Sequence, residues 1–146
     1  MIVNQSAPAA GVVPILIYAD VGKAIDWLAH AFGFKERLRA ERNGVVGHAQ
    51  LVVAGGALML GRQGAEYHPP RPGEIQQYVH ISVDAIDAHY DRARGAGARI
   101  VQPPHDMPFG ERQYTAEDIG GHRWTFSQSV ADVPLEKWGA RSPQGK

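Results

Sequence analysis

The sequence predicts an α+β fold of two tandem βαβββ units, and three observations lead to that prediction. Stretches typical of strands and helices follow one another in the same order in each half of the chain. The helix starts, helix ends and turns of the two halves superpose at a nearly constant shift. A proline- and glycine-rich linker at residues 63–75 separates the halves. We therefore expect one domain whose strands form a curved mixed sheet with a concave pocket.

The first unit is expected over residues 12–62. Its opening strand is the apolar run 12–18, in which Pro14 favours an edge position or the beginning of the strand. Asp20 stands where a helix N-cap belongs, and Gly33 stands where a helix commonly ends. The other predicted elements are a helix at residues 21–32 and strands at residues 34–42, 45–53 and 57–60, with turns at residues 43–44 and 55–56.

The second unit is expected over residues 76–129 and repeats this order. Asp84 is expected to cap a helix, and Asp87 three residues later resembles the partner residue of a capping box. In the last strand Trp124 and Phe126 alternate with polar residues, which predicts one packed face and one open face. The predicted strands lie at residues 76–83, 99–102, 113–117 and 122–128, and the predicted helix lies at 85–94. A loop is expected at 103–110 and a tight turn at 118–121. Residues 130–146 are expected to form a C-terminal tail, with Trp138 as its possible anchor.

The two units match at positions where backbone geometry restricts the choice of residue. A shift of 64 residues superposes the predicted caps Asp20 and Asp84, and a shift of 65 superposes the turn glycines at 55–56 on those at 120–121. An internal duplication accounts for these matches. The alternative is that aspartate caps and glycine ends recur in any protein built of strands and helices.

Length and composition limit the classes of function. With 146 residues the chain is long enough to bury a core without disulfides or metals. Its 15 basic and 15 acidic residues cancel without forming a basic block, so we expect no nucleic-acid and no membrane partner. We find no signal peptide and no apolar run long enough to span a membrane. The chain has no cysteine, which excludes cysteine nucleophiles and fits the cytoplasmic location that we expect.

The second half of the chain contains the motifs Val79-x-Ile81-x-Val83-Asp84, the glycine-rich helix end at 94–97, Pro103-Pro104, Gly110-x-Arg112 and the stretch 117–126, and residues 24–34 add one in the first half. These motifs resemble the vicinal oxygen chelate superfamily, which includes glyoxalase I, bleomycin-resistance proteins and extradiol dioxygenases. Together they cover residues 12–129 and are most similar to glyoxalase-like, bleomycin-resistance-type members. One departure is Ile119, where the family commonly has proline.

The resemblance implies a test for a metal site. Metal-dependent members carry His or Glu ligands on the first and last strands of each unit, because a divalent ion that holds substrate oxygens needs fixed donors. The equivalent positions here are Val13, Met59 (or Leu60 if the register slips), Tyr78 and Thr125, and none of them is His, Asp or Glu. We therefore expect no metal and no other cofactor. An unconventional site made of His48, Gln50 and His80 remains an alternative.

The concave face is expected to hold a small organic ligand over an aromatic and apolar floor with a few polar groups. The expected ligand-binding residues are His48, Gln50, Met59, Tyr78, His80, Arg112, Tyr114, Arg123 and Thr125. Arg112 and Arg123 could hold an anionic group, or could instead pair with Glu117 or Asp118. No arrangement of nucleophile and base is recognisable, so we assign no catalytic residue.

The resemblance and these residues together predict a metal-independent small-molecule binding protein of the glyoxalase/bleomycin-resistance type, which sequesters a ligand or an antibiotic. One alternative is a metal-dependent glyoxalase-like lyase, isomerase or dioxygenase with unconventional ligands. Another is a metal-free enzyme with His80 or His48 as its general base. Because members of the superfamily often pair, we also expect a homodimer.

Overall fold

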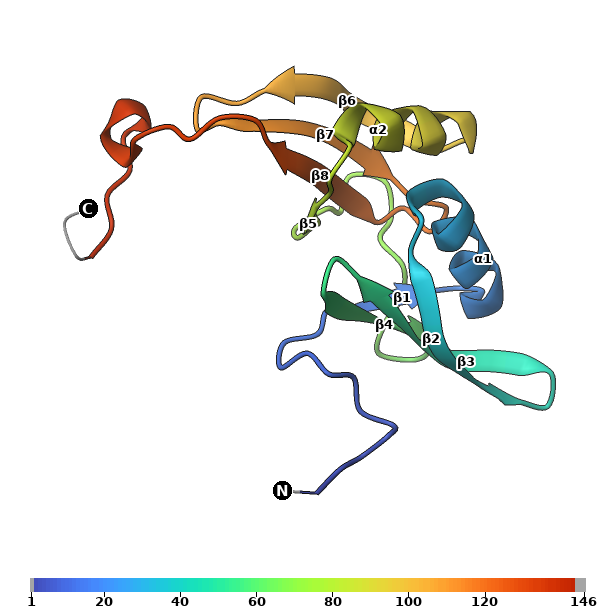
Figure 1. Cartoon of the computed structure of the whole chain (residues 1–146). Helices are drawn as coiled ribbons and strands as arrows, with labels where there is room; N and C mark the ends of the chain where they lie inside the picture. Colours follow the sequence, from blue (N-terminus) through green and yellow to red (C-terminus); the bar gives the residue numbers. More distant parts are fainter. Residues whose placement is uncertain (1, 144–146) are drawn as a thin grey trace.

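The computed structural model, which describes residues 2–143, confirms the α+β class and the two tandem βαβββ units (Figure 1). The first unit contains β1 (Ile15–Tyr18), α1 (Val21–Phe32), β2 (Lys35–Arg42), β3 (Val45–Val53) and β4 (Gly56–Arg62). The second contains β5 (Val79–Ser82), α2 (Ile86–Gly95), β6 (Arg99–Asp106), β7 (Glu111–Glu117) and β8 (Arg123–Ser129), and a short 3-10 helix, η1 (Leu135–Trp138), follows.

The strands are hydrogen-bonded as two four-stranded mixed sheets with equivalent orders. The first sheet has the order β1-β4-β3-β2 and the second has the order β5-β8-β7-β6. The opening strand of each unit runs parallel to its last strand, and the remaining neighbours are antiparallel. The topological equivalence of the sheets supports the duplication that the turn and cap positions predict.

The first unit follows its local sequence signals closely. The Asp20 side chain accepts a hydrogen bond of 3.0 Å from the backbone N–H of Lys23 and so caps α1 as expected. The helix ends at Gly33, whose φ of 76° is the left-handed conformation that favours glycine. Pro14 lies just before β1, and β1 is an edge strand.

The second unit corrects three predictions. Of the strand expected at 76–83, only Val79–Ser82 forms β5. Asp84 does not cap α2: the helix begins at Ile86, whose backbone N–H donates to the Gln128 side chain at 3.0 Å. The first half of the expected loop at 103–110 is strand, because β6 continues to Asp106. Two prolines fit in β6 because it is an edge strand whose register shifts twice between Ile100 and His105.

The core lies between the sheets and the two helices, which pack against each other (Figure 1). Trp124 and Phe126 on β8 are fully buried, as their alternation predicts. Phe32 at the end of α1 contacts both rings, with centroid separations of 6.0 Å and 4.8 Å. Phe34 also packs against Trp124, so aromatic side chains of both units share one core.

Asp118, in the turn between β7 and β8, joins the two units. Its buried carboxylate accepts hydrogen bonds from the Tyr18 hydroxyl at 2.5 Å and from the Trp124 indole N–H at 3.0 Å. It also accepts from the backbone N–H groups of Gly120 and His122. A Cβ at position 120 would lie 2.6 Å from the Tyr18 ring, so this turn needs glycine for the close approach of β1.

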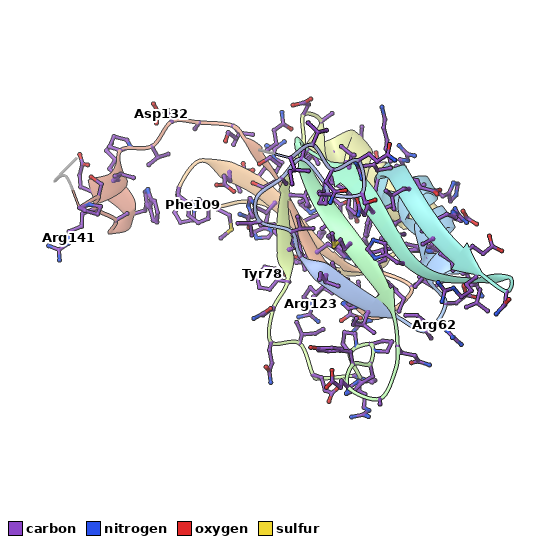
Figure 2. The ribbon with its side chains drawn as sticks, turned by 90° about the horizontal axis from the view of Figure 1, so that it is seen from below. Arg62, Tyr78, Phe109, Arg123, Asp132 and Arg141 are labelled. Atoms are coloured by element: carbon purple, nitrogen blue, oxygen red, sulfur yellow. The ribbon has the colours of Figure 1, made fainter. Side chains whose placement is uncertain are left out.

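Three segments outside the sheets complete the described chain. Residues 2–14 lead into β1, and residues 63–78 connect β4 to β5. Residues 130–143 extend away from the second sheet (Figure 2). Trp138 in this segment contacts Phe109, with ring centroids 5.2 Å apart. Within residues 2–143, no helix is long and apolar enough to cross a membrane.

Candidate functional site

Each sheet has one face packed against the helices and an opposite face, which we call the open face. The side-chain alternation and the strand register assign the residues to these faces. The open face of the first sheet carries Ile15, Ile17, Leu38, Ala40, His48, Gln50 and Met59. The open face of the second sheet carries His80, Ser82, Glu111, Gln113, Thr115, Glu117, Arg123, Thr125 and Ser127.

The open face of the first sheet is mostly apolar. Met59 lies between Ile15 on β1 and Gln50 on β3, so two apolar side chains adjoin one carboxamide. Gln50 is only 2% exposed, and its Nε2 lies 3.3 Å from the Nε2 of His48. The side-chain oxygen of Gln50 accepts a hydrogen bond from Arg37. The two polar groups that the sequence suggested here are therefore adjacent.

The open face of the second sheet is polar, and its hydrogen bonds converge on Glu111. The Glu111 carboxylate accepts hydrogen bonds from the Ser127 hydroxyl and from the Gln113 amide, the latter at 3.0 Å. The Nε2 of His80 lies 3.2 Å from the same carboxylate. The hydrogen bonds from Ser127 and Gln113 hold the pKa of the Glu111 carboxyl below its ordinary value. Glu111 is therefore a charged anchor for three neighbouring side chains.

Glu117 forms a second charged cluster on the same face. Arg123 contacts its carboxylate at 2.7 Å and Arg99 contacts it at 2.6 Å. Burial opposes ionisation of Glu117, but the hydrogen bonds from the two arginines outweigh it and lower the pKa of the carboxyl. Arg123 thus forms the ion pair with Glu117 that the sequence allowed.

Two expected site residues lie on the wrong face. Tyr114 is fully buried on the helix-facing side of β7, where it pairs with Phe126. Arg112 shares that side and forms ion pairs with Asp106 and Asp87 at 2.7 Å and 3.2 Å. The reason is the register of the hairpin, in which residue 115 opposes residue 125 and the odd-numbered residues of β7 face outward. We therefore leave both residues out of the site.

The residues at the family's metal positions do not fit a divalent cation. Met59 and Thr125 lie on the open faces, with Val13 and Tyr78 just outside β1 and β5. None of these side chains supplies an imidazole or a carboxylate. His48 and His80 lie on different sheets, and no group of three or more His, Asp or Glu within residues 2–143 could hold a metal ion.

A cavity of about 790 Å³ lies beside the open face of β1, under the connecting segment 63–78. Its lining residues are Ile15, Ile17, Tyr67, His68, Pro70, Gly73, Glu74, Ile75, Gln76, Gln77 and His122. An adjoining cavity of about 470 Å³ shares the connecting segment and is lined by Arg99, Glu117 and Arg123. Figure 2 views this side, on which Tyr78 and Arg123 are labelled.

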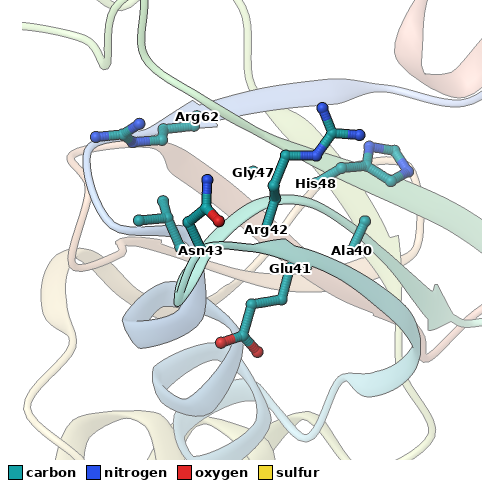
Figure 3. Close-up of a pocket in the computed structure, with 8 residues that line it drawn as sticks. Ala40, Glu41, Arg42, Asn43, Gly47, His48 and Arg62 are labelled. Atoms are coloured by element: carbon teal, nitrogen blue, oxygen red, sulfur yellow. The ribbon is translucent and has the colours of Figure 1, made fainter.

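His48 and His80 line other cavities. His48 lines a cavity of about 530 Å³ at the hairpin between β2 and β3, with Arg42 and Arg62 nearby (Figure 3). In that view Arg42 and His48 lie on the same side of the hairpin, whereas Glu41 points away. His80 lines a cavity of about 360 Å³ between β4 and β5. The residues expected to share one pocket are thus distributed over separate hollows.

Several polar residues on or near the open faces were not among the expected site residues, among them Arg37, Arg99, Glu111 and Ser127. Alternation with Arg123 and Thr125 indicates the outward direction of Ser127. The outward direction of the Glu111 side chain can be inferred once the register of β7 is known. Arg37 has no such signal, because it lies at a register shift of β2, between Glu36 and Leu38.

Comparisons with known proteins assign the family. The sequence model described as Glyoxalase/Bleomycin resistance protein/Dioxygenase superfamily matches residues 11–126. An uncharacterised protein of Mycobacterium tuberculosis is 31% identical over 140 residues, which cover 90% of this chain and 82% of that protein. TioX from Micromonospora sp. ML1 is 37% identical and superposes with a TM-score of 0.69 over 86% of this chain and 100% of its own.

A more distant structure has the same fold. The fosfomycin resistance protein FosX from Listeria monocytogenes is 14% identical, with a TM-score of 0.62 over 88% of this chain and 97% of its own. This similarity extends to the fold alone. On the strength of the family match, which spans most of the sequence, the chain belongs to the glyoxalase/bleomycin resistance protein/dioxygenase superfamily.

Proposed function

We propose that the protein binds a small organic molecule without a metal ion, as a binding or sequestering member of its superfamily. The observation that carries the proposal is the cavity of about 790 Å³ beside the apolar open face of β1. It occurs in a chain whose four expected metal-ligand positions hold Val13, Met59, Tyr78 and Thr125. An apolar wall with a few polar groups is the usual composition of a small-molecule pocket.

The proposed ligand lies against the open face of β1 and extends toward the arginines of the second sheet. Ile15 and Ile17 supply the apolar wall, and His122 and Tyr67 supply polar groups. Of the ligand-binding residues expected from the sequence, Arg123 lines the adjoining cavity, whereas His48, Gln50, Met59, Tyr78, His80 and Thr125 line neither of these two cavities and stay a prediction. Sequestration of an antibiotic is one form of this function, since the description of the matching superfamily includes a bleomycin resistance protein.

The test is a screen of small organic molecules by thermal melting, in the presence of a metal chelator. The proposal expects at least one compound to raise the melting temperature and to bind in calorimetry with the chelator present. Ile15→Arg should abolish that binding, because a charged side chain would enter the cavity wall. The matched control is Val52→Arg, an exposed valine on the same sheet that does not line this cavity. Binding that needs added metal would contradict the proposal.

A second candidate function is metal-free proton transfer by His80. The observation that favours it is the contact of 3.2 Å between the Nε2 of His80 and Glu111. A carboxylate that accepts the Nε2 proton leaves the Nδ1 lone pair available as a base. The test uses a small ketone, such as dihydroxyacetone, in heavy water. The measurement is the uptake of deuterium at the carbons next to the carbonyl group. Uptake that disappears in His80→Gln and persists in His68→Gln would support this function; equal uptake in both variants would reject it.

We also propose a homodimer, which the family relationship supports. Tyr78 is aromatic, lies at the open side and is 59% exposed. A second copy would cover such a side chain. Light scattering of the full chain should give twice the mass of one chain, and a monomeric mass at working concentration would contradict the proposal.

A further inference from the structure

The segment that precedes β1 crosses the open face of the first sheet. The backbone carbonyl of Ser6 accepts a hydrogen bond of 2.8 Å from the Gln50 side chain, and the carbonyl of Gln5 accepts one of 2.7 Å from Arg37. β1 lies at one edge of the sheet, whereas β3 and β2 lie toward the other edge. The segment therefore doubles back over the face instead of leaving the sheet at β1.

Arg37 reaches this face because β2 is irregular there. The pairing passes from Glu36 opposite Leu51 to Leu38 opposite Gln50, so Arg37 is an extra residue between two ladder pairs. Its guanidinium donates to the side-chain oxygen of Gln50 and, through its other nitrogen, to the Gln5 carbonyl. The irregularity thus directs a donor toward the open face.

The contact with Arg37 fixes the orientation of the Gln50 carboxamide. Because the oxygen of Gln50 faces Arg37, its NH₂ group faces the Ser6 carbonyl. Arg37 and Gln50 therefore present two side-chain donors to two successive carbonyl oxygens. Gln50 is 2% exposed although neither α1 nor α2 covers this face, so its polar group depends on these partners.

The segment that occupies the two donors is only lightly attached to the sheet. Residues 2–7 are exposed, and a local turn holds their shape. In that turn the backbone N–H of Ser6 donates to the Asn4 side chain, and the N–H of Ala7 donates to the Asn4 carbonyl. No side chain of residues 2–6 is buried in the core. A ligand that offers the same acceptors can replace the segment at small cost.

We propose that Arg37 and Gln50 form a binding subsite for a ligand with two neighbouring amide carbonyl groups. Residues 4–7 occupy this subsite until such a ligand displaces them. The subsite rests on the proposed function, because it extends the ligand-binding surface from the wall at β1 to the polar pair on β2 and β3. It also identifies the chemical class of the ligand as an amide or peptide-like molecule.

The experiment uses the full chain, labelled with ¹⁵N, and the capped dipeptide acetyl-alanyl-alanine methylamide as the probe. The proposal expects saturable shifts of the Gln50 side-chain amide at millimolar probe. Over the same titration, the backbone amides of residues 4–7 should become more mobile, because the segment leaves the face. Asn4→Gly, which removes an acceptor from the local turn, should tighten binding of the probe.

Substitutions on β2 and β3 distinguish the donors from the general surface. Arg37→Met and Gln50→Leu should each weaken binding of the probe by about tenfold, which is the usual effect of removing a hydrogen bond of this kind. The matched control is Arg39→Met, on the same strand, because Arg39 pairs with Glu36 and Asp26 instead. Arg37 is exposed, so its variant should fold even if Gln50→Leu does not.

Three outcomes would overturn the subsite: no saturable binding of the probe to Asn4→Gly, unchanged affinity in Arg37→Met, or binding that leaves residues 4–7 unaffected. Its failure is distinguishable from failure of the proposed function. If a screened organic compound binds the Ile15 wall but is insensitive to Arg37→Met, the subsite is wrong and the binding function stands. If no compound binds at all, the proposed function itself fails.

Discussion

The open faces of the two sheets share a strand order but differ in chemistry. In the first sheet, apolar side chains surround one buried carboxamide, and the polar groups there bond to the chain's own N-terminal segment. In the second sheet, the carboxylates of Glu111 and Glu117 bond to side chains of their own sheet. The same strand order thus carries two different outward surfaces.

This difference between the two faces bears on which of them can bind a ligand and which mainly stabilises the fold. A face whose polar groups are satisfied within its own sheet gains little from a ligand, because the ligand must displace hydrogen bonds that already exist. A face whose donors are held by a light segment can exchange that segment for a ligand. We therefore expect substitutions in the Glu111 cluster of the second face to alter folding and substitutions on the first face to alter binding.

The largest effect is expected where the two units are joined. Asp118→Ala would leave the Tyr18 hydroxyl and the Trp124 indole N–H without their buried acceptor. Burial, together with the neighbouring carboxylate, raises the pKa of Tyr18 and keeps it a neutral donor. The free energy of unfolding should fall by about 3 kcal/mol, measured by urea denaturation. Tyr18→Phe, which removes one donor, should cost about 1 kcal/mol; equal losses in both variants would contradict the account.

Glu111→Gln tests the comparison of the two faces, because it should weaken the hydrogen bonds of the second face and leave those of the first face unchanged. The substitution removes the charge that strengthens the hydrogen bonds from Ser127 and Gln113, so unfolding should become easier by about 1–2 kcal/mol at neutral pH. Because the folded-state pKa of Glu111 is lowered from 4.5, its contribution is present above that pH and is lost as the pH falls through the folded-state pKa.

The corresponding measurement is chemical denaturation over a series of acidic pH values. The wild-type chain should lose stability on acidification more steeply than Glu111→Gln. Glu41→Gln is the control, since Glu41 is an exposed carboxylate on β2 outside this cluster. An unchanged acid profile in Glu111→Gln would show that Glu111 does not anchor the second face.

A smaller acid effect is expected from His89, which connects the two units beneath the sheets. Its ring contacts the Phe32 carbonyl at 3.0 Å and the Tyr114 hydroxyl at 2.5 Å. Burial lowers the pKa of His89 from 6.5, although the Phe32 carbonyl opposes the shift. The unfolded chain therefore binds the proton more readily, and stability should fall as the pH drops below 6.5.

His89→Gln should remove that part of the pH dependence. It should cost about 1 kcal/mol at neutral pH, because a carboxamide replaces the imidazole only in part. Thermal melting between neutral and mildly acidic pH measures both effects. A steeper pH dependence in the variant than in the wild type would contradict the assignment of a neutral His89.

The smallest effect on folding is expected on the first face. Met59→Gln adds a polar group to an open face without removing a core side chain, so unfolding should change by only about 0.5 kcal/mol. Binding of a screened organic ligand should nevertheless weaken, because Met59 adjoins Ile15. Calorimetry with that ligand checks the prediction. A large loss of stability with unchanged binding would reverse the roles that we assign to the two faces.

The sequence predicted what depends on local signals. Asp20 and Gly33 delimit α1 as expected, and the alternation of Trp124 and Phe126 identified the packed side of β8. Predictions from the sequence were wrong where the hydrogen-bond partner of a residue comes from a distant part of the chain. Asp84 was expected to cap α2, but Gln128 supplies the acceptor from β8.

The site was harder to predict than the fold because a face depends on register. The sequence around the turn at 118–121 allows either parity for β7, and a shift of one residue exchanges Tyr114 with Thr115. Arg37 was missed for a related reason, since a local irregularity in β2 breaks the alternation. The residue types identified which strands carry polar side chains. Only the pairing of the strands showed which face of the sheet each side chain occupies.

The most direct test of metal-independent binding is the metal content of the purified full chain by plasma mass spectrometry, followed by melting with added Zn²⁺, Ni²⁺, Mn²⁺ or Fe²⁺. Our account predicts far less than one metal ion per chain and no shift in melting temperature. Stoichiometric metal, or a shift that His48→Ala or His80→Ala abolishes, would contradict it and would place the protein among the metal-dependent members of its superfamily.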